Sequence, residues 1–307
     1  MKPHIVVVGS SNTDLIVRVP RIPRPGETIL GGRFTTAPGG KGANQAVAAA
    51  RAGARVTLIA RVGRDAFGSQ ALAGFVRDGI DVRFVRRDPD APSGVALIFV
   101  AADGQNSIAV AGGANANLSV ADVRRAQRAF AHARVLLLQL ETPLPTVKAA
   151  AQLAARRGVR VVLNPAPARD LPDELLRRVS VLTPNEIEAA ALSGVKVRDL
   201  ASAEKAARRL LQRGVEAVII TLGARGALVS SAAGTERVKG FRVRAVDTTA
   251  AGDVFNGALA VALSEGRPLR EAVRFANAAA AISVTRMGAQ PSAPTRDEIE
   301  RLLRTRP

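Results

Sequence analysis

Short runs of apolar residues alternate along the chain with longer stretches in which apolar residues recur at helical spacing. The short runs have the length and composition of buried strands: Ile5–Val8, Val56–Ile59, Val135–Leu138, Val159–Leu163, Val179–Leu182 and Val215–Ile220. The helical stretches are Gly42–Ala52, Ser69–Asp78, Val120–Ala131, Pro145–Arg157 and Ala201–Gln212. This alternation predicts an α/β fold, a three-layer sandwich in which helices flank a mainly parallel central sheet. Ligands bind such sheets in the crevice beyond the carboxyl ends of the strands.

Two regions contain predicted strands with no helix between them. These strands are Leu15–Pro20 and Glu27–Phe34 in the first region, and Val82–Val85, Gly94–Ala101 and Asn106–Val110 in the second. We therefore expect a small antiparallel β lid, with its strands within residues 15–34 and 82–110. The lid would belong to a single domain over residues 1–307, and almost all of Gly252–Arg304 is predicted to be helical.

The composition excludes several classes of protein. Hydrophobic residues make up 47% of the 307 residues, which is enough for a sizeable core. No apolar run approaches the roughly 20 residues that span a bilayer, and the N-terminus is typical of a strand and not of a signal peptide. Because the chain has no cysteine, disulfides and thiolate metal sites are excluded. We expect a cytoplasmic protein with no membrane partner.

The formal net charge of +18 raises the question of nucleic-acid binding. The basic residues are spread along the whole chain and form no basic arm. The chain also has no Trp and no Tyr, the residues on which single-stranded bases usually stack. We therefore expect no nucleic-acid partner, although a positive field would attract an anionic nucleotide.

The segment Asp247–Asp253, DTTAAGD, carries the strongest chemical signal. Three small residues lead directly into a predicted helix: Ala250, Ala251 and Gly252. Backbone N–H groups at a helix N-terminus form a binding site for phosphate or for developing negative charge. Asp253 in the first turn is placed to take a proton from a hydroxyl beside that site. A carboxylate that only complements the helix dipole explains the same spacing.

Other polar clusters lie near the ends of predicted strands. Gly39–Asn44, GGKGAN, opens a helix, and its glycines allow close backbone approach to a ligand, although a structural turn is the simpler explanation. It lacks the spacing of a phosphate-binding P-loop. Asn12, Asp14 and Glu141 supply groups that can hydrogen-bond the hydroxyls of a ligand. Taken singly, each of them is more simply a solvated loop residue.

Two further segments are ambiguous by themselves. Thr221–Gly226 has glycines able to flank a nucleotide, but a hairpin turn would also contain them. Asn185–Glu188 would lie near phosphates and their metal, or would only form an acidic helix N-terminus. The chain shows no Ser-His-Asp order and no zinc-ligand spacing, so nucleophilic hydrolysis and zinc chemistry are not supported.

Taken together and in order, these segments resemble those of the ribokinase-like carbohydrate kinase family over nearly the whole chain. The matching segments are Gly9–Asp14, Pro25–Glu27, Gly39–Val47, Asn164–Ala168, Thr183–Glu186, Asp247–Asn256 and Gly288–Ser292. Several are weak alone, but their shared order is highly specific. The resemblance implies a central sheet flanked by helices, and a β lid that pairs with the lid of a second subunit in a homodimer.

The resemblance also implies roles for individual residues. The sugar-binding positions of the family are matched by Asn12, Asp14, Gly40, Lys41, Asn44, Glu141 and Asp253, of which Asp253 is also the catalytic base. The nucleotide positions are matched by Asn185, Thr221, Gly223, Arg225, Gly226, Gly252 and Asn277. Asn185 and Glu188 match a motif associated with magnesium and phosphate. An activating monovalent cation, usually K⁺, is implied at Asp247, Thr249, Ser283, Arg286, Gly288 and Ser292.

The implied reaction is transfer of the γ-phosphoryl group of ATP, bound with Mg²⁺, to the terminal hydroxyl of ribose. A kinase for deoxyribose, fructose or a nucleoside such as adenosine is the nearest alternative, and a sugar-binding protein without catalysis is another. Asp14 and Asn44 favour a sugar with free vicinal hydroxyls. The intact Gly252–Asp253 pair argues against a loss of catalysis.

Overall fold

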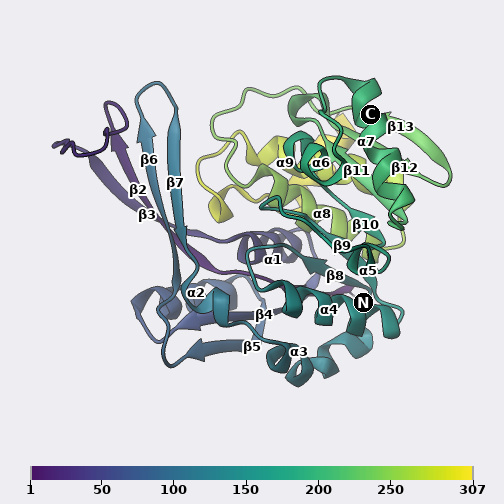
Figure 1. Ribbon diagram of the computed structural model, residues 1–307, viewed down its shortest axis with the longest axis horizontal. Helices are drawn as coiled ribbons and strands as arrows, with labels where there is room; N and C mark the ends of the chain where they lie inside the picture. The colour runs from purple at the N-terminus through teal and green to yellow at the C-terminus, as the bar shows by residue number, and fades with distance from the viewer. Residues whose placement is uncertain (1, 306–307) are drawn as a thin grey trace.

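In the computed structural model, which describes residues 2–305, a nine-stranded sheet carries helices on both faces and a four-stranded sheet projects from one end (Figure 1). The large sheet has the strand order β13-β12-β11-β10-β9-β8-β1-β4-β5. Its strands are β1 (His4–Val8), β4 (Arg55–Gly63), β5 (Asp81–Asp88), β8 (Val135–Leu138), β9 (Arg160–Leu163), β10 (Val181–Leu182), β11 (Ala217–Thr221), β12 (Ala227–Ser231) and β13 (Gly234–Val238). Strands β11 to β5 are parallel, and β12 and β13 extend the sheet as an antiparallel hairpin.

Helices cover both faces of this sheet, which explains the unbroken apolar runs in its strands. Ile5 and Val7 face a core formed with α1, α8 and α9, whereas Val6 and Val8 face a second core formed with α3, α4 and α7. This two-residue alternation is that of a strand buried on both sides, and the expected α/β sandwich is confirmed. No helix within residues 2–305 is both long and apolar enough to cross a membrane.

The helices follow the predicted ranges closely. They are α1 (Lys41–Arg51), α2 (Ala66–Arg77), α3 (Val120–Arg125), α4 (Leu144–Arg156), α5 (Asp173–Leu176), α6 (Glu186–Ser193), α7 (Leu200–Gln212), α8 (Ala251–Ser264), α9 (Leu269–Ser283) and α10 (Arg296–Thr305). Short 3-10 turns are η1 (Gly113–Asn117), η2 (Gln127–His132), η3 (Gly223–Arg225) and η4 (Gln290–Ser292). The expected helix over 120–131 is thus divided between α3 and η2.

The small sheet stands away from the helical body, as Figure 1 shows. Its strands, in the order β3-β2-β6-β7, are β2 (Asn12–Val19), β3 (Arg33–Gly39), β6 (Gly94–Ala101) and β7 (Asn106–Ala111). The outer pairs β2–β3 and β6–β7 are antiparallel, as expected, but the central pair β2–β6 is parallel. We refer to this four-stranded sheet as the lid.

Two expectations about the lid are corrected by the structure. The assignment of Val82–Val85 to the lid is wrong, because this segment is part of β5 and pairs in parallel with β4 in the large sheet. Phe84 and Val85 pack against opposite cores of the body, which fixes the strand there. The strand expected over 27–34 begins only at Arg33, because Glu27 closes a turn: its backbone N–H bonds the carbonyl of Arg24 (3.0 Å) and its carboxylate accepts from the Arg24 N–H (3.0 Å).

A cluster of buried charges joins β4, β5 and α3 at the far edge of the body. Arg61 donates to Asp88 and to Asp122, at 2.8 Å in both cases, and Arg86 also donates to Asp122 (3.1 Å). Burial raises the pKa of both carboxyls, but the hydrogen bonds from Arg61 and from backbone N–H groups outweigh it. The pKa of Asp122 is lowered to about 2 and that of Asp88 also lies well below its ordinary value.

Candidate active site

Two adjoining cavities lie at the carboxyl ends of the parallel strands. The smaller cavity, about 210 Å³, has among its lining residues Lys41, Asn164, Thr183, Asn185, Glu188, Thr221, Gly252 and Asp253. The larger cavity, about 550 Å³, lies between residues 221–226, residues 240–245 and helices α8 and α9. Four residues border both cavities: Thr221, Thr248, Ala251 and Gly252. The start of α8 is therefore the wall that the two cavities share.

The chain enters α8 through a strained residue. Ala250 has a left-handed backbone conformation (φ 57°), and no other non-glycine residue within 2–305 has a positive φ. This conformation costs about 1–2 kcal/mol for an L-residue and is often kept at functional sites. Within the same residues, no acceptor is found for the N–H groups of Ala250, Gly252 and Asp253, whereas the Ala251 N–H donates to the carbonyl of Thr248 (3.2 Å). The predicted anion site therefore has free N–H groups, but Ala251 does not contribute a free one.

Asp253 is almost fully buried, with 6% of its surface exposed, and is held by two side-chain amides. Asn44 donates through Nδ2 to Oδ2 (3.0 Å), and Gln45 donates through Nε2 to Oδ1 (3.0 Å). Burial raises the pKa of Asp253 above its ordinary value, and the charge of Lys41 and the two amides offset only part of this effect. A carboxylate with a raised pKa accepts a proton more readily than a solvated one, as a general base requires.

Gln45 is a functional candidate that sequence reasoning missed. It is fully buried, and its Nε2 also donates to Oδ1 of Asn164 (3.2 Å), while its Oε1 accepts from Nε2 of Gln139 (2.5 Å). Asn164 in turn donates to the carbonyl of Thr183 (3.1 Å). This connected chain of amides fixes the orientation of the Asp253 carboxylate, so Gln45 is a positioning residue.

Replacing Gln45 with leucine is expected to lower kcat by about ten- to a hundredfold, because the base loses a hydrogen bond to its charged form. The lost bond also raises the pKa of Asp253 further, so the acidic limb of the kcat–pH profile should move to higher pH. Gln152→Leu is the matched control, because Gln152 is an exposed glutamine on α4. If kcat falls at every pH while the acidic limb stays at its wild-type pH, Gln45 has only a structural role.

Asp14, Lys41 and Glu141 gather beside Asp253. The backbone N–H of Lys41 donates to Glu141 Oε2 (2.9 Å). Burial, together with the charges of Glu141 and Asp253, raises the pKa of Asp14 to about 6. Burial lowers the pKa of Lys41, but the charges of Asp253, Glu141 and Glu188 outweigh this effect and raise it. Lys41 therefore stays charged at the edge of the smaller cavity, where it can face an anionic group.

Two glycines make the approach of β2 to α1 possible. A Cβ atom on Gly39 would lie 2.3 Å from Oδ1 of Asp14, so the missing side chain leaves the space that this carboxylate occupies. Gly40 has φ 86°, and a Cβ atom there would lie 2.6 Å from the backbone nitrogen of Asn12. Both positions are therefore structural, and Gly40 is also part of the predicted sugar site.

Two asparagines present polar groups to the same region. Asn12 is held by Asn115, which the sequence did not indicate, through a bond from Nδ2 of Asn115 to Oδ1 of Asn12 (2.7 Å). Asn44 binds Asp253 through its amide nitrogen, while its buried oxygen Oδ1 has no partner within residues 2–305. A buried acceptor without a donor points to a ligand hydroxyl, because such atoms are rarely left unpaired.

The value of kcat/KM for the sugar is expected to fall as the pH decreases through about 6, the pKa of Asp14. Burial raises that pKa, and only the ionised carboxylate accepts two hydroxyl hydrogen bonds. Asp14→Asn should lower kcat/KM at neutral pH and remove this limb of the profile. Asp103→Asn in the lid turn is the control and should keep it. A limb unchanged in Asp14→Asn would contradict the assignment.

The larger cavity collects most of the predicted nucleotide residues. These are Thr221, Gly223, Gly226, Gly252 and Asn277. Asn277 is buried and its Nδ2 lies 3.3 Å from the carbonyls of both Val238 and Lys239, so it ties α9 to the end of β13. Arg225 does not line the cavity, because its guanidinium turns away to pair with Glu186 (2.5 Å).

Asn185 and Glu188 form a reciprocal cap at the start of α6. Asn185 Oδ1 accepts from the Glu188 N–H (2.8 Å), and Glu188 Oε2 accepts from the Asn185 N–H (2.9 Å). The structural interpretation of this segment is thus correct, yet both residues also line the smaller cavity. Burial raises the pKa of Glu188, and the charge of Asp253 adds to this effect.

Asp247 joins the loop before α8 to the loop after α9. Its Oδ1 accepts from the Thr249 N–H (2.9 Å) and its Oδ2 from the Gly288 N–H (2.8 Å). The carbonyl of Val284 accepts from the N–H groups of Val246 and Asp247, at 2.7 and 3.1 Å. Three of the six predicted cation residues are therefore directly connected.

The other three residues use their side chains elsewhere. The hydroxyls of Ser283 and Ser292 bond carbonyls within their own turns, at 2.8 and 2.7 Å, and Arg286 pairs with Glu298 of α10 (2.5 Å). Arg286 could contribute to a cation site only through its backbone carbonyl, whereas the two serines could use a backbone carbonyl or the lone pairs of a hydroxyl. Carbonyl oxygens suit hard cations, so the donor set is compatible with a monovalent ion.

The comparison with known proteins agrees with this geometry. Residues 2–296 match the family model described as pfkB family carbohydrate kinase. The chain therefore belongs to the pfkB family of carbohydrate kinases. Its fold is the one that the resemblance implies.

Three individual proteins are similar to the chain over nearly its whole length. The chain is 50% identical over 298 residues to the ribokinase of Haemophilus influenzae, with 97% of each chain covered. The structure of Arabidopsis thaliana ribokinase complexed with ribose and ATP matches with a TM-score of 0.91 at 34% identity, covering 99% of each chain. The chain is also 38% identical to the deoxyribokinase of Salmonella typhi, over 97% of this chain and 98% of that one.

Proposed function

We propose that this chain phosphorylates D-ribose at its 5-hydroxyl with ATP, giving ribose 5-phosphate and ADP, and that Asp253 is the base. The observation that carries the proposal is the position of Asp253. Its buried carboxylate lies in the first turn of α8, beside free N–H groups and between the cluster of Asp14, Lys41 and Glu141 and the larger cavity. The relatives named ribokinase and the complex with ribose and ATP support the choice of substrates.

The proposed reaction is an in-line displacement. The sugar would be held by Asp14, Asn44 and Glu141, with Asn44 Oδ1 accepting from a hydroxyl. Asp253 removes the proton of the 5-hydroxyl, and the oxygen of that hydroxyl bonds the γ-phosphorus. The bond between the γ-phosphorus and the β–γ bridging oxygen breaks, so ADP leaves. The free N–H groups at the start of α8 stabilise the charge on the moving phosphoryl group, and losing one such donor typically costs about 10²–10³-fold in rate.

Two metal ions are part of the proposal. Glu188, beside Asn185, provides an oxygen donor at the smaller cavity, of the kind that magnesium prefers. Mg²⁺ bound with ATP would neutralise phosphate charge. The loops joined by Asp247 would hold K⁺ largely through backbone carbonyls and would position the start of α8.

The lid is the proposed dimer contact. It exposes several apolar side chains, among them Leu97, Ile108 and Val110, which are each about half exposed (48%, 54% and 54%). Its outer strands β3 and β7 have free edges, which proteins usually cover. Pairing with the lid of a second copy would cover both the exposed apolar side chains and the free strand edges. We also expect the protein in the cytoplasm, where ATP is available.

The test is a coupled assay of ADP release with ribose, 2-deoxyribose, fructose and adenosine, each with and without potassium. We expect the highest kcat/KM with ribose and a higher rate with K⁺. A preference for 2-deoxyribose would favour the function of the deoxyribokinase relative. No acceptor-dependent release of ADP would contradict the proposal as a whole.

A further inference from the structure

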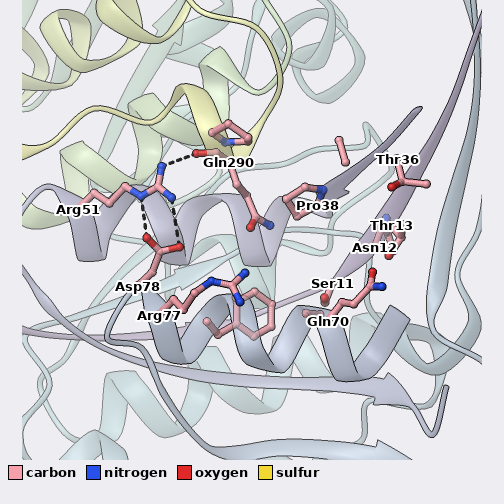
Figure 2. A pocket seen from close by; sticks show the side chains of 15 residues that line it. Ser11, Asn12, Thr13, Thr36, Pro38, Arg51, Gln70, Arg77, Asp78 and Gln290 are labelled. Carbon is pink, nitrogen blue, oxygen red and sulfur yellow. Dashed lines mark hydrogen bonds and ion pairs between the residues drawn. The ribbon is translucent and has the colours of Figure 1, made fainter. Parts of the chain in front are cut away.

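A third pocket, of about 490 Å³, lies behind the root of the lid and shares no lining residue with the two cavities of the candidate active site. Figure 2 shows it between β2 and β3 on one side and α2 and the turn η4 on the other. Phe75, Ala71, Pro38 and Pro291 provide apolar surface, and a few polar side chains converge on the space. This volume and this composition are typical of a pocket for a small molecule.

Gln290 offers hydrogen-bonding groups to a ligand in this pocket. It is 7% exposed, and its side-chain amide has no hydrogen-bond partner within residues 2–305, although an amide offers two donors and an acceptor with two lone pairs. Figure 2 shows this amide pointing into the pocket. The amide is open to the pocket and is not sealed in the core, so it is available to bond a polar group of a ligand there.

The charges around the pocket indicate the kind of ligand. Arg51 is fully occupied, because it bonds Asp78 (2.8 and 3.3 Å) and the carbonyls of Gln290 (2.7 Å) and Ala293 (3.3 Å). Arg77, in contrast, lines the pocket without any hydrogen bond or ion pair in the described part of the chain. A free guanidinium beside a free amide is a favourable arrangement for a carboxylate or phosphate. The hydroxyls of Thr13 and Thr36 and the amide of Gln70 offer further hydrogen bonds.

The pocket lies directly behind the strand that carries the predicted sugar residues. Thr13 and its cross-strand partner Pro38 line the pocket, whereas the next residue, Asp14, projects from the opposite face of β2 toward the active site. Arg51 also connects the pocket to α1, the helix that carries Lys41 and Asn44. A ligand in this pocket would therefore contact both β2 and α1, the two elements that carry predicted sugar residues.

We propose that this pocket binds a small hydroxylated organic anion, a carboxylate or a phosphate ester, through Arg77 and Gln290. An occupant shifts the position of β2 and so changes the affinity for the sugar. The second statement rests on the proposed sugar site, but the binding itself does not.

Isothermal titration of the full chain with citrate and with glycerol 3-phosphate, at constant ionic strength and with saturating ADP, tests the binding. Two variants remove the pocket in different ways. Arg77→Ala deletes the charge. Gly74→Leu fills the space, because Gly74 lines the pocket and a Cβ atom there would meet only Arg77 Nη2, at 3.7 Å. Arg124→Ala, an exposed arginine on α3, is the matched control for charge.

We expect saturable binding of at least one probe, at least about tenfold weaker in both pocket variants and unchanged in Arg124→Ala, because each variant removes a feature that the ligand needs. Binding of citrate would indicate a site for carboxylates, and binding of glycerol 3-phosphate would indicate a site for phosphate esters. Binding that persists in both pocket variants, or no saturable binding of either probe, would overturn the site. The KM for ribose should change with the probe in the wild type and not in Gly74→Leu, and a constant KM despite binding would overturn the coupling to the sugar.

Discussion

Replacing Asp253 with asparagine is expected to lower kcat by at least about 10²-fold, because the carboxylate proposed to accept the hydroxyl proton is lost. The fold should remain intact. The amide of Asn44 can turn so that its unpaired Oδ1 accepts from the new side-chain NH₂, while Gln45 still donates to the remaining oxygen. Steady-state kinetics in the coupled assay, with ribose binding measured separately, check the prediction.

The same substitution should make the protein slightly more stable at neutral pH. Burial raises the pKa of Asp253 in the folded state above its value in the unfolded chain, so its charge destabilises the fold at any pH above the unfolded pKa. Asp297→Asn is the matched control, because Asp297 is an exposed aspartate in the first turn of α10. It should change neither kcat nor Tm noticeably. If Asp253→Asn keeps more than about a tenth of wild-type kcat, its carboxylate only complements the helix dipole and is not the base.

Replacing Arg61 with alanine is expected to lower the free energy of unfolding by about 3 kcal/mol, because the buried carboxylates of Asp88 and Asp122 lose their shared cation. Both carboxylates are almost inaccessible (1% and 2% side-chain exposure), so water cannot replace the guanidinium. Chemical denaturation at pH 7 measures the effect. Arg83→Ala is the control, because Arg83 pairs with Asp81 at the surface and is 79% exposed. It should change the stability little.

The effect of Arg61 should also depend on pH. The pKa values of Asp88 and Asp122 are lower in the folded protein than in the unfolded chain. Their stabilising contribution is therefore fully present above the unfolded pKa of about 4 and is lost as the pH falls through the folded value. The difference between wild type and Arg61→Ala should shrink as the pH decreases from about 5 toward 2. A difference that stays constant over this range would mean that Arg61 acts by packing alone.

The sequence predicted well those parts of the fold that depend on local pattern. A strand buried on both sides appears as an unbroken apolar run, and β1 and β8 were found in this way. The same pattern did not reveal which sheet a strand joins. The pattern places Val82–Val85 in the lid because the segment precedes other strands without a helix between them, but its pairing with β4 depends on contacts distant in sequence.

The site shows a similar division. Asp253, Asp14 and Lys41 lie in segments that match the family's motifs, and Glu141 matches a family position, so the resemblance names all four. Gln45 could not be singled out, since nothing in an alanine-rich helix distinguishes a glutamine that faces a carboxylate from one that faces solvent. Its role depends on Asn164 and Asp253, which lie 119 and 208 residues further along the chain.

Strand β2 runs without a break from Asn12, buried in the body, to Val19 in the lid. Because β2 pairs with β3 on one side and with β6 on the other, bending the lid along β2 would distort a hydrogen-bonded ladder. A lid built in this way would move most at its free end and least at its base, where Asn12 and Asp14 lie. The predicted sugar residues at the base would thus stay nearly in place while the far end of the lid moves.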